Sequence, residues 1–274
     1  MKPFLLLVLS LIILSSFFSY KNHLPKAKQI EKVFIPINEK LLVCKYEVSN
    51  GEYKQFMDFL ISTKQEVYRK CLLDTMQQFR RLTNESHKVN YHSHPNFKTY
   101  PVVTVSYEGA NEYCNWLTKQ YNSDKDRKYK KVVFRLPTEA EWMQAASGGN
   151  KNKMYPWGNF YLRNSKGEFL CNFLRLGDQS IFYDDKSKTY KVAETFIESA
   201  NQNAQTTPVN EFPANPDGFY NLSGNAAEMV AEIGLAKGGS FNDPGQNVTI
   251  SSKKYYNGPS LEIGFRVLME IIDK

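Results

Sequence analysis

The most informative stretch of the sequence is DGFYNLSGNAAEMVAE, residues 217–232, together with two short stretches downstream, AKGGSF at 236–241 and IGFR at 263–266. Calcium prefers six to eight oxygen ligands from carboxylates, amide side chains and main-chain carbonyls. Asn221 offers an amide oxygen and Glu228 a carboxylate, and a turn at Gly224-Asn225 would direct the carbonyls of Gly224 and Ala226 inward. The same residues also fit an Asx-type turn before a strand, with Asn225 in a left-handed conformation. The spacing alone leaves both interpretations open.

The N-terminus has the character of an export segment. Lys2 precedes the apolar run FLLLVLSLIILSSFF at 4–18. A short positive region followed by an apolar stretch of this length is typical of a signal peptide. The run is slightly shorter than the ~20 residues of a spanning helix. We therefore predict that residues 1–20 are either a signal peptide or an N-terminal membrane anchor, and that residues 21–32 are a linker.

Charge and cysteine content exclude some functions. The net charge of +7 is dispersed, and the basic cluster DKDRKYKK at 124–131 reads as a solvated loop. No recognised reader motif accompanies it, so no nucleic-acid partner is expected. The four cysteines lack C-x-x-C or Cys/His metal spacing, and their pairing cannot be deduced. They are Cys44, Cys71, Cys114 and Cys171.

Helix signals concentrate in the first half of the chain. Ser49 and Glu52 form a capping box, and apolar residues follow at helical spacing. A second helix is predicted from Ser106, and a third after the capping box of Thr138 and Glu141. Beyond these helices the pattern is short strands and turns, which favours α+β over alternating βαβ units. Strands are also predicted at 33–37 and 41–46, and an insertion with its own helical pattern at 62–95.

Seven motifs occur along the chain in one fixed order. They are KYEVSNGEY (45–53), YPVVTVSYEGANEYCNWL (100–117), FRLPTEAEWMQAASGG (134–149), YPWGN (155–159), TPVNEFPANPDGFYNLSGNAAE (207–228), KGGSF (237–241) and GFR (264–266). Together they resemble the formylglycine-generating enzyme, or sulfatase-modifying factor, family. The resemblance implies one compact α+β domain over 33–274, akin to the C-type lectin fold, with little regular secondary structure and with structural calcium.

The resemblance also implies where calcium would bind. The better-kept calcium site of the family falls on four residues of the turn, Asn221, Gly224, Ala226 and Glu228. The other family site begins at an Asn followed by an apolar residue, here Asn172-Phe173. Its partners should include an Asp, but ANQNA at 200–204 has no carboxylate. We expect structural calcium at the turn and only a weak second site at Asn172 and Phe173.

The family chemistry depends on copper. Its oxidases bind copper(I) through two cysteines, three and eight residues after the Ser of GGS, and convert a cysteine of a sulfatase peptide to formylglycine with oxygen. Soft thiolates suit copper(I). Counting from Ser240, this chain has Asp243 and Val248, a hard carboxylate and a side chain without a ligand atom. Copper is not expected, and the sequence names no catalytic residue beyond these two family positions.

A rival hypothesis is that the chain is an enzyme. His92 and His94 are two residues apart and would share a face on a strand, so they could bind a metal with Asp243 nearby. This would give a metal-dependent oxidoreductase acting on a protein or thiol substrate. Because no carboxylate is placed beside the histidines by spacing, a solvated loop explains them more simply.

Aromatic residues gather in loop-rich segments, which line ligand surfaces in lectin-like scaffolds. They are Tyr155, Trp157, Phe160, Tyr161, Tyr183, Tyr255 and Tyr256, with Trp157 itself read as core packing. We predict an exported, non-catalytic binding or scaffold protein of the periplasm, cell envelope or exterior. Its expected partner is an envelope protein or peptide, by analogy with gliding- and secretion-associated relatives.

Overall fold

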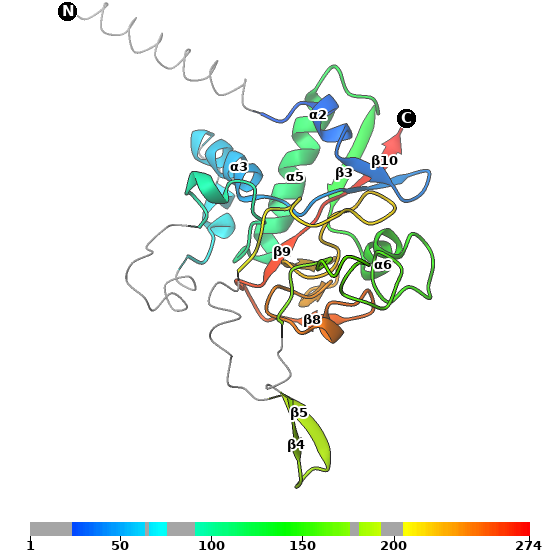
Figure 1. The fold of residues 1–274 in the computed structure, drawn as a ribbon. Helices are drawn as coiled ribbons and strands as arrows, with labels where there is room; N and C mark the ends of the chain where they lie inside the picture. The colour runs from blue at the N-terminus through cyan, green and yellow to red at the C-terminus, as the bar shows by residue number, and fades with distance from the viewer. Residues whose placement is uncertain (1–23, 64–65, 76–90, 176–180, 193–204) are drawn as a thin grey trace, which may run out of the picture.

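The computed structural model describes residues 24–63, 66–75, 91–175, 181–192 and 205–274 (Figure 1). The predicted signal or anchor segment, residues 76–90 of the predicted insertion, and all of ANQNA lie outside these residues. Among the described residues, no helix combines the length and the apolar character needed to cross a membrane.

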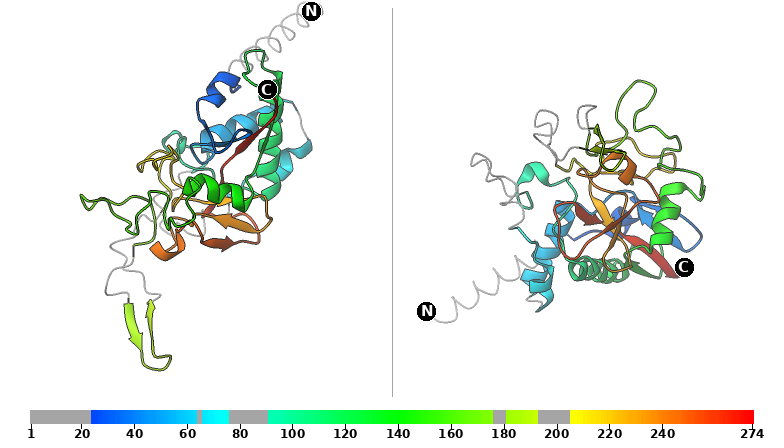
Figure 2. Two further views of the ribbon diagram at one scale, coloured as in Figure 1. Left: turned by 90° about the vertical axis from the view of Figure 1, so that its right-hand side faces the viewer. Right: turned by 90° about the horizontal axis from the view of Figure 1, so that it is seen from below.

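Two four-stranded sheets organise the domain (Figures 1 and 2). The first has the order β1-β2-β10-β3 with antiparallel neighbours, and the second has the order β8-β7-β6-β9, in which β6 and β9 are parallel. A hairpin, β4–β5, stands apart from both sheets in Figure 1. The strand bounds are β1 Phe34–Pro36, β2 Leu41–Cys44, β3 Lys131–Arg135, β4 Ile181–Asp184, β5 Thr189–Val192, β6 Ala227–Met229, β7 Leu235–Lys237, β8 Lys253–Tyr255, β9 Ile263–Phe265 and β10 Leu268–Asp273.

Helices come mainly from the first half of the chain, as the capping signals predict. Ser49 caps its helix by accepting from the main-chain N–H of Glu52, whose carboxylate accepts from the N–H of Ser49. The same reciprocal pair joins Thr138 and Glu141, and Gly148 ends that helix in a left-handed conformation. The helices are α2 Ala27–Glu31, α3 Asn50–Ser62, α5 Tyr107–Ser123 and α6 Glu139–Ser147, with 3-10 turns η1 Glu66–Cys71, η2 Pro95–Phe97 and η4 Gly245–Asn247.

Aromatic packing fills the main core. Tyr53 and Phe56 of α3 meet Tyr113 and Trp116 of α5, with ring centroids 5.4–6.0 Å apart. Phe265 of β9 lies 5.5 Å from Tyr113, so the second sheet joins the same core. Buried aromatic pairs of this geometry contribute beyond their area. A second cluster around Trp142 of α6 packs against the turn that leads into β6.

The mixed α+β domain is confirmed, and two local predictions are corrected. The segment 24–32 is not a linker, because α2 buries Ala27 and Ile30 in the main core. In the described part of the predicted insertion, the helical pattern becomes the 3-10 turn η1 rather than an α-helix.

Candidate functional site

The turn 221–228 carries unusual backbone geometry. Asn221, Gly224 and Asn225 have φ angles of 51°, 74° and 62°. A Cβ at Gly224 would lie 2.0 Å from the carbonyl oxygen of Asn172. That oxygen accepts from the N–H of Asn225 at 2.8 Å. The turn is therefore clamped against the segment around Asn172, and only glycine fits position 224.

A buried carboxylate holds this turn from within. Glu47, which follows β2, is 1% exposed. Its oxygens accept from Nδ2 of Asn221 at 2.9 Å, from Nδ2 of Asn225 at 3.0 and 3.1 Å, and from the main-chain N–H of Ala226 at 3.1 Å. Burial, and next the charge of Glu228, raise the pKa of Glu47 to about 8, against the lowering effect of Arg266 and the two amides.

The side chain of Asn221 is divided between two environments. Its Nδ2 donates to Glu47 and lies 3.5 Å from the carbonyl oxygen of Pro208. Its Oδ1 is buried without a hydrogen-bond partner. Buried polar atoms are rarely left unpaired, so this oxygen has the character of an unfilled ligand position.

Glu228 on β6 is engaged elsewhere. Both of its oxygens accept from the guanidinium of Arg266, and Oε2 also accepts from Nε1 of Trp142 at 2.7 Å. Glu228 is 1% exposed and Arg266 is fully buried. An ionised carboxylate offers about four acceptor positions, and these contacts use them. The four predicted calcium residues thus lie on one turn, but the contacts of Glu228 do not favour it as a ligand, whereas Asn221 Oδ1 fits a cation.

The weaker predicted site lies beside the same turn. Asn172 forms a parallel bridge with Gly224, and its Nδ2 donates to the carbonyl of Gln205 at 2.9 Å. Phe173 packs edge-on against Phe169. The main-chain carbonyl of Asn172 already accepts from the N–H of Asn225, so this position offers a cation fewer free oxygens than the turn does.

Asp243 is held in an ion pair after the GGS. Its Oδ2 accepts from the main-chain N–H and the hydroxyl of Ser240, at 2.8 and 2.7 Å. Nζ of Lys254 on β8 lies 2.8 and 2.6 Å from its two oxygens. The same Nζ is 2.7 Å from the carboxylate of Glu262. Burial alone would lower the pKa of Lys254, but these two carboxylates raise it, so the amine stays charged.

Val248 is fully buried. It packs with Tyr155 and Cys171 in a small cluster, and its carbonyl accepts from the hydroxyl of Ser223 at 2.6 Å. Burial raises the pKa of Cys171 to about 12, so the thiol beside this family position stays protonated. All four cysteines are buried free thiols.

The two histidines serve the local structure. His92 lies between Oδ1 of Asn50 at 3.0 Å and Oγ1 of Thr104 at 3.1 Å, and burial lowers its pKa to about 4. His94 caps η2 by accepting from the N–H of Asn96. Among the described residues, no group of three or more His, Cys, Asp or Glu is placed to hold a metal ion. The structure does not bring these histidines together with Asp243 as a metal site.

The predicted aromatic residues divide between packing and exposure. Tyr155 and Trp157 stack 5.0 Å apart, and Nε1 of Trp157 donates to the carbonyl of Tyr161. Phe160, Tyr161 and Tyr255 are 69%, 73% and 76% exposed. Tyr256 packs on the main core, and the side chain of Tyr183 lies outside what the structure describes.

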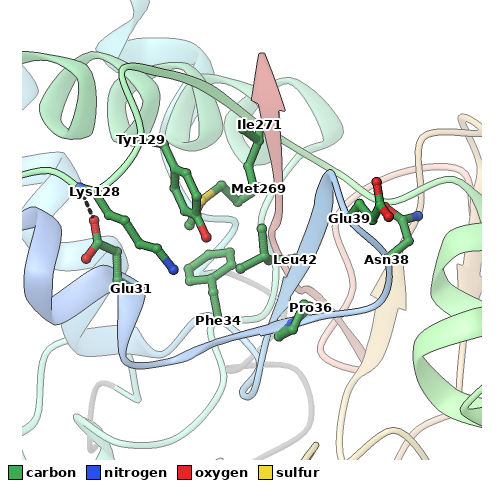
Figure 3. A pocket seen from close by; sticks show the side chains of 10 residues that line it. All are labelled: Glu31, Phe34, Pro36, Asn38, Glu39, Leu42, Lys128, Tyr129, Met269 and Ile271. Carbon is green, nitrogen blue, oxygen red and sulfur yellow. Dashed lines mark hydrogen bonds between the residues drawn. The ribbon is translucent and has the colours of Figure 1, made fainter. Parts of the chain in front are cut away.

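A separate hollow lies away from these residues. It has a volume of about 200 Å³ and opens between α2, the β1–β2 hairpin and β10 (Figure 3). Glu31 at its rim accepts from the N–H of Lys128. None of the predicted site residues lines it.

Sequence reasoning missed two partners in the site. Glu47 lies in KYEVSNGEY but carries no metal or catalytic spacing, and Lys254 lies in SSKKYY, which matches no motif. Their side chains meet the site through contacts 174 and 11 residues apart in the chain. Only the position of Glu47 inside a family motif could have drawn attention to it.

The two sheets, the clamped turn and the loop after GGS define a domain of the formylglycine-generating type. Residues 34–271 match the Sulfatase-modifying factor enzyme 1-like domain family, and the chain belongs to this family. Solved structures share the fold: CarF, with a TM-score of 0.55 at 21% identity over 85% of this chain and 87% of CarF, and Treponema denticola variable protein 1, with 0.52 at 17% over 84% of each.

Sequence relatives include proteins named as formylglycine-generating enzymes and proteins named as inactive members. Mouse formylglycine-generating enzyme is 31% identical over 133 residues, 48% of this chain and 27% of that protein. Bovine inactive C-alpha-formylglycine-generating enzyme 2 is 35% identical over 133 residues, 48% of this chain and 33% of that protein. The chain thus spans about a quarter to a third of the length of the relatives it matches.

Proposed function

We propose that this chain is an exported, non-catalytic member of the sulfatase-modifying factor family that works as a binding or scaffold protein of the cell envelope. The observation that carries the proposal is the ion pair of Asp243 with Lys254. It occupies the first family copper position with a carboxylate already committed to an ammonium group.

Copper(I) chemistry is disfavoured by the donors at both family positions. A hard carboxylate is a poor ligand for a soft ion, and a charged amine within 2.8 Å repels any added cation. Val248 brings no donor atom and is buried. The similarity to an inactive family member supports a role without oxidation, and the apolar run after Lys2 supports export.

An exposed aromatic loop supports the binding role. Phe160 and Tyr161 are adjacent and exposed on a loop fixed by the Trp157 hydrogen bond. Large rigid aromatic side chains supply contact area at low entropic cost. The partner we propose is a protein or peptide of the envelope.

Pull-down from envelope extracts tests this role. The variant Phe160→Ser/Tyr161→Ser should lose the captured partner, whereas Ile233→Ser, which alters a side chain 79% exposed elsewhere, should keep it. Equal capture by wild type and both variants, or no capture by any, would argue against this surface.

We also propose that the turn binds structural calcium. Asn221 Oδ1 and the main-chain carbonyls of Gly224 and Ala226 would supply oxygens, and the ion would brace the left-handed turn. Chelation with EDTA should then lower the melting temperature, and added calcium should restore it. A melting temperature that EDTA does not change would contradict the proposal.

A further inference from the structure

Three ionisable side chains are buried together around the turn. Glu47, Glu228 and Arg266 are each at most 1% exposed. The guanidinium of Arg266 bonds to Glu228 and to two main-chain carbonyls, those of Cys44 and Tyr220. The direct partners of Glu47 are instead N–H groups of the turn itself. Arg266 therefore holds Glu228, whereas Glu47 holds the turn.

The Asn221 amide connects Glu47 to an open ligand position. Its nitrogen donates to Glu47 Oε2 at 2.9 Å, while its oxygen is buried with no partner. Asn221 itself is 7% exposed. A donor bound to a carboxylate polarises its own amide, which makes the amide oxygen a stronger acceptor. That oxygen is the atom through which Asn221 would bind calcium.

Glu47 also fixes the rest of the turn. Its oxygens hold the side chain of Asn225 and the main-chain N–H of Ala226. One carboxylate thus grips three residues of the turn. Outer partners of this kind orient metal ligands and tune their affinity.

We propose that Glu47 is the positioning residue of the calcium site, and that Glu228 is not one of its ligands. This inference rests on the calcium binding proposed above. It departs from the family assignment, in which the only carboxylate of the site is Glu228. In this chain Glu228 serves Arg266 and Trp142 instead.

Calorimetric titration of the chelator-treated full chain with calcium tests the assignment. Glu47→Gln and Glu228→Gln form a matched pair, because each replaces a carboxyl group that is 1% exposed by an amide of similar shape. Glu47→Gln should raise the Kd for calcium by about 10–100-fold. Glu228→Gln should leave it within about threefold, with near-ultraviolet circular dichroism confirming that each variant is folded.

Two milder variants test the same proposal if the glutamine variants do not fold. Glu47→Asp keeps a carboxyl group on a side chain that is one methylene shorter, so the Kd for calcium should still rise measurably. Trp142→Phe removes one donor to Glu228 without leaving a buried charge, and should not change the Kd.

The outcomes separate the two proposals. If the wild type does not bind calcium, the calcium proposal and this inference both fail. If the wild type binds and a folded Glu47 variant binds equally well, or if the Glu228 variants alone lose binding, this inference fails while calcium binding stands.

Discussion

Among single residues, Arg266 is a buried side chain of the site whose guanidinium is held by an ion pair and by main-chain carbonyls. It is fully buried, it pairs with Glu228, and it donates to the carbonyls of Cys44 and Tyr220. From its position directly after β9, its guanidinium thus links the end of β2 with the residue that precedes the turn 221–228. Planar forked donors suit such a role better than an ammonium group does.

Removing Arg266 should therefore be severe. Arg266→Met leaves Glu228 buried without its cation, which should lower the free energy of unfolding by about 3–5 kcal/mol. The double variant Arg266→Met/Glu228→Gln should recover part of that loss, because no unpaired charge remains. Urea denaturation measures both. A single variant as stable as the wild type would show that the ion pair contributes little.

His92 should give a pH dependence of defined sign. Its pKa is about 4 in the folded chain, against an ordinary value of 6.5. Between these values the unfolded chain binds a proton that the folded chain does not, so the free energy of unfolding should fall as pH drops from 6.5 to 4. The loss should reach about 3 kcal/mol at most.

The variant His92→Gln isolates this contribution. Glutamine keeps a donor and an acceptor for Asn50 and Thr104 but does not titrate. Denaturation curves from pH 7.5 to 4 should therefore fall less steeply for the variant. Parallel curves for the two proteins would contradict the assigned shift.

At the scale of elements, the turn 221–228 depends on one glycine. Gly224→Ala adds both left-handed strain and a contact of 2.0 Å with the carbonyl of Asn172. Gly149 offers a matched control, because its φ of 80° is similar and nothing lies within 4 Å of its Cβ position.

The two alanine variants should differ sharply. Gly149→Ala should cost about 1–2 kcal/mol of unfolding free energy from backbone strain alone. Gly224→Ala should cost at least about 3 kcal/mol, since the Asn172 carbonyl must also move. Thermal and urea denaturation would measure both losses. Equal losses would mean that the clamp between the turn and Asn172 is dispensable.

Local signals in the sequence predict some elements well and others poorly. The capping boxes at Ser49 and Thr138 place α3 and α6 correctly, because a cap is made by residues three apart. Helix α2 is missed, because its stability comes from burial of Ala27 and Ile30 and from the carboxylate of Asp124, which accepts from the N–H of Ala27. A segment of five residues is too short for its apolar residues to show a helical period.

At the scale of the whole molecule, the site is assembled by contacts between distant segments. Motif order predicts the family and the turn, and it directs attention to Asp243 and Val248. It cannot predict that Glu47 reaches Asn221 from 174 residues away, or that Lys254 neutralises Asp243. Those partners depend on how the two sheets pack, which no short motif encodes.

The molecule thus keeps a family scaffold around an altered position. Two sheets, a shared aromatic core and the clamped turn form the scaffold, while an ion pair and a buried valine stand at the two positions where the family resemblance predicts thiolates. Loops on a rigid frame change function without loss of the core. A binding role on this scaffold is consistent with its exposed aromatic loop.

Mass spectrometry of a cysteine-containing sulfatase peptide, incubated with the copper(I)-treated protein, oxygen and a thiol reductant, shows whether this chain oxidises the cysteine. We expect an unchanged peptide mass, while mouse formylglycine-generating enzyme converts the same peptide under the same conditions. Copper-dependent conversion of the cysteine to formylglycine by this chain would overturn the proposed non-catalytic role.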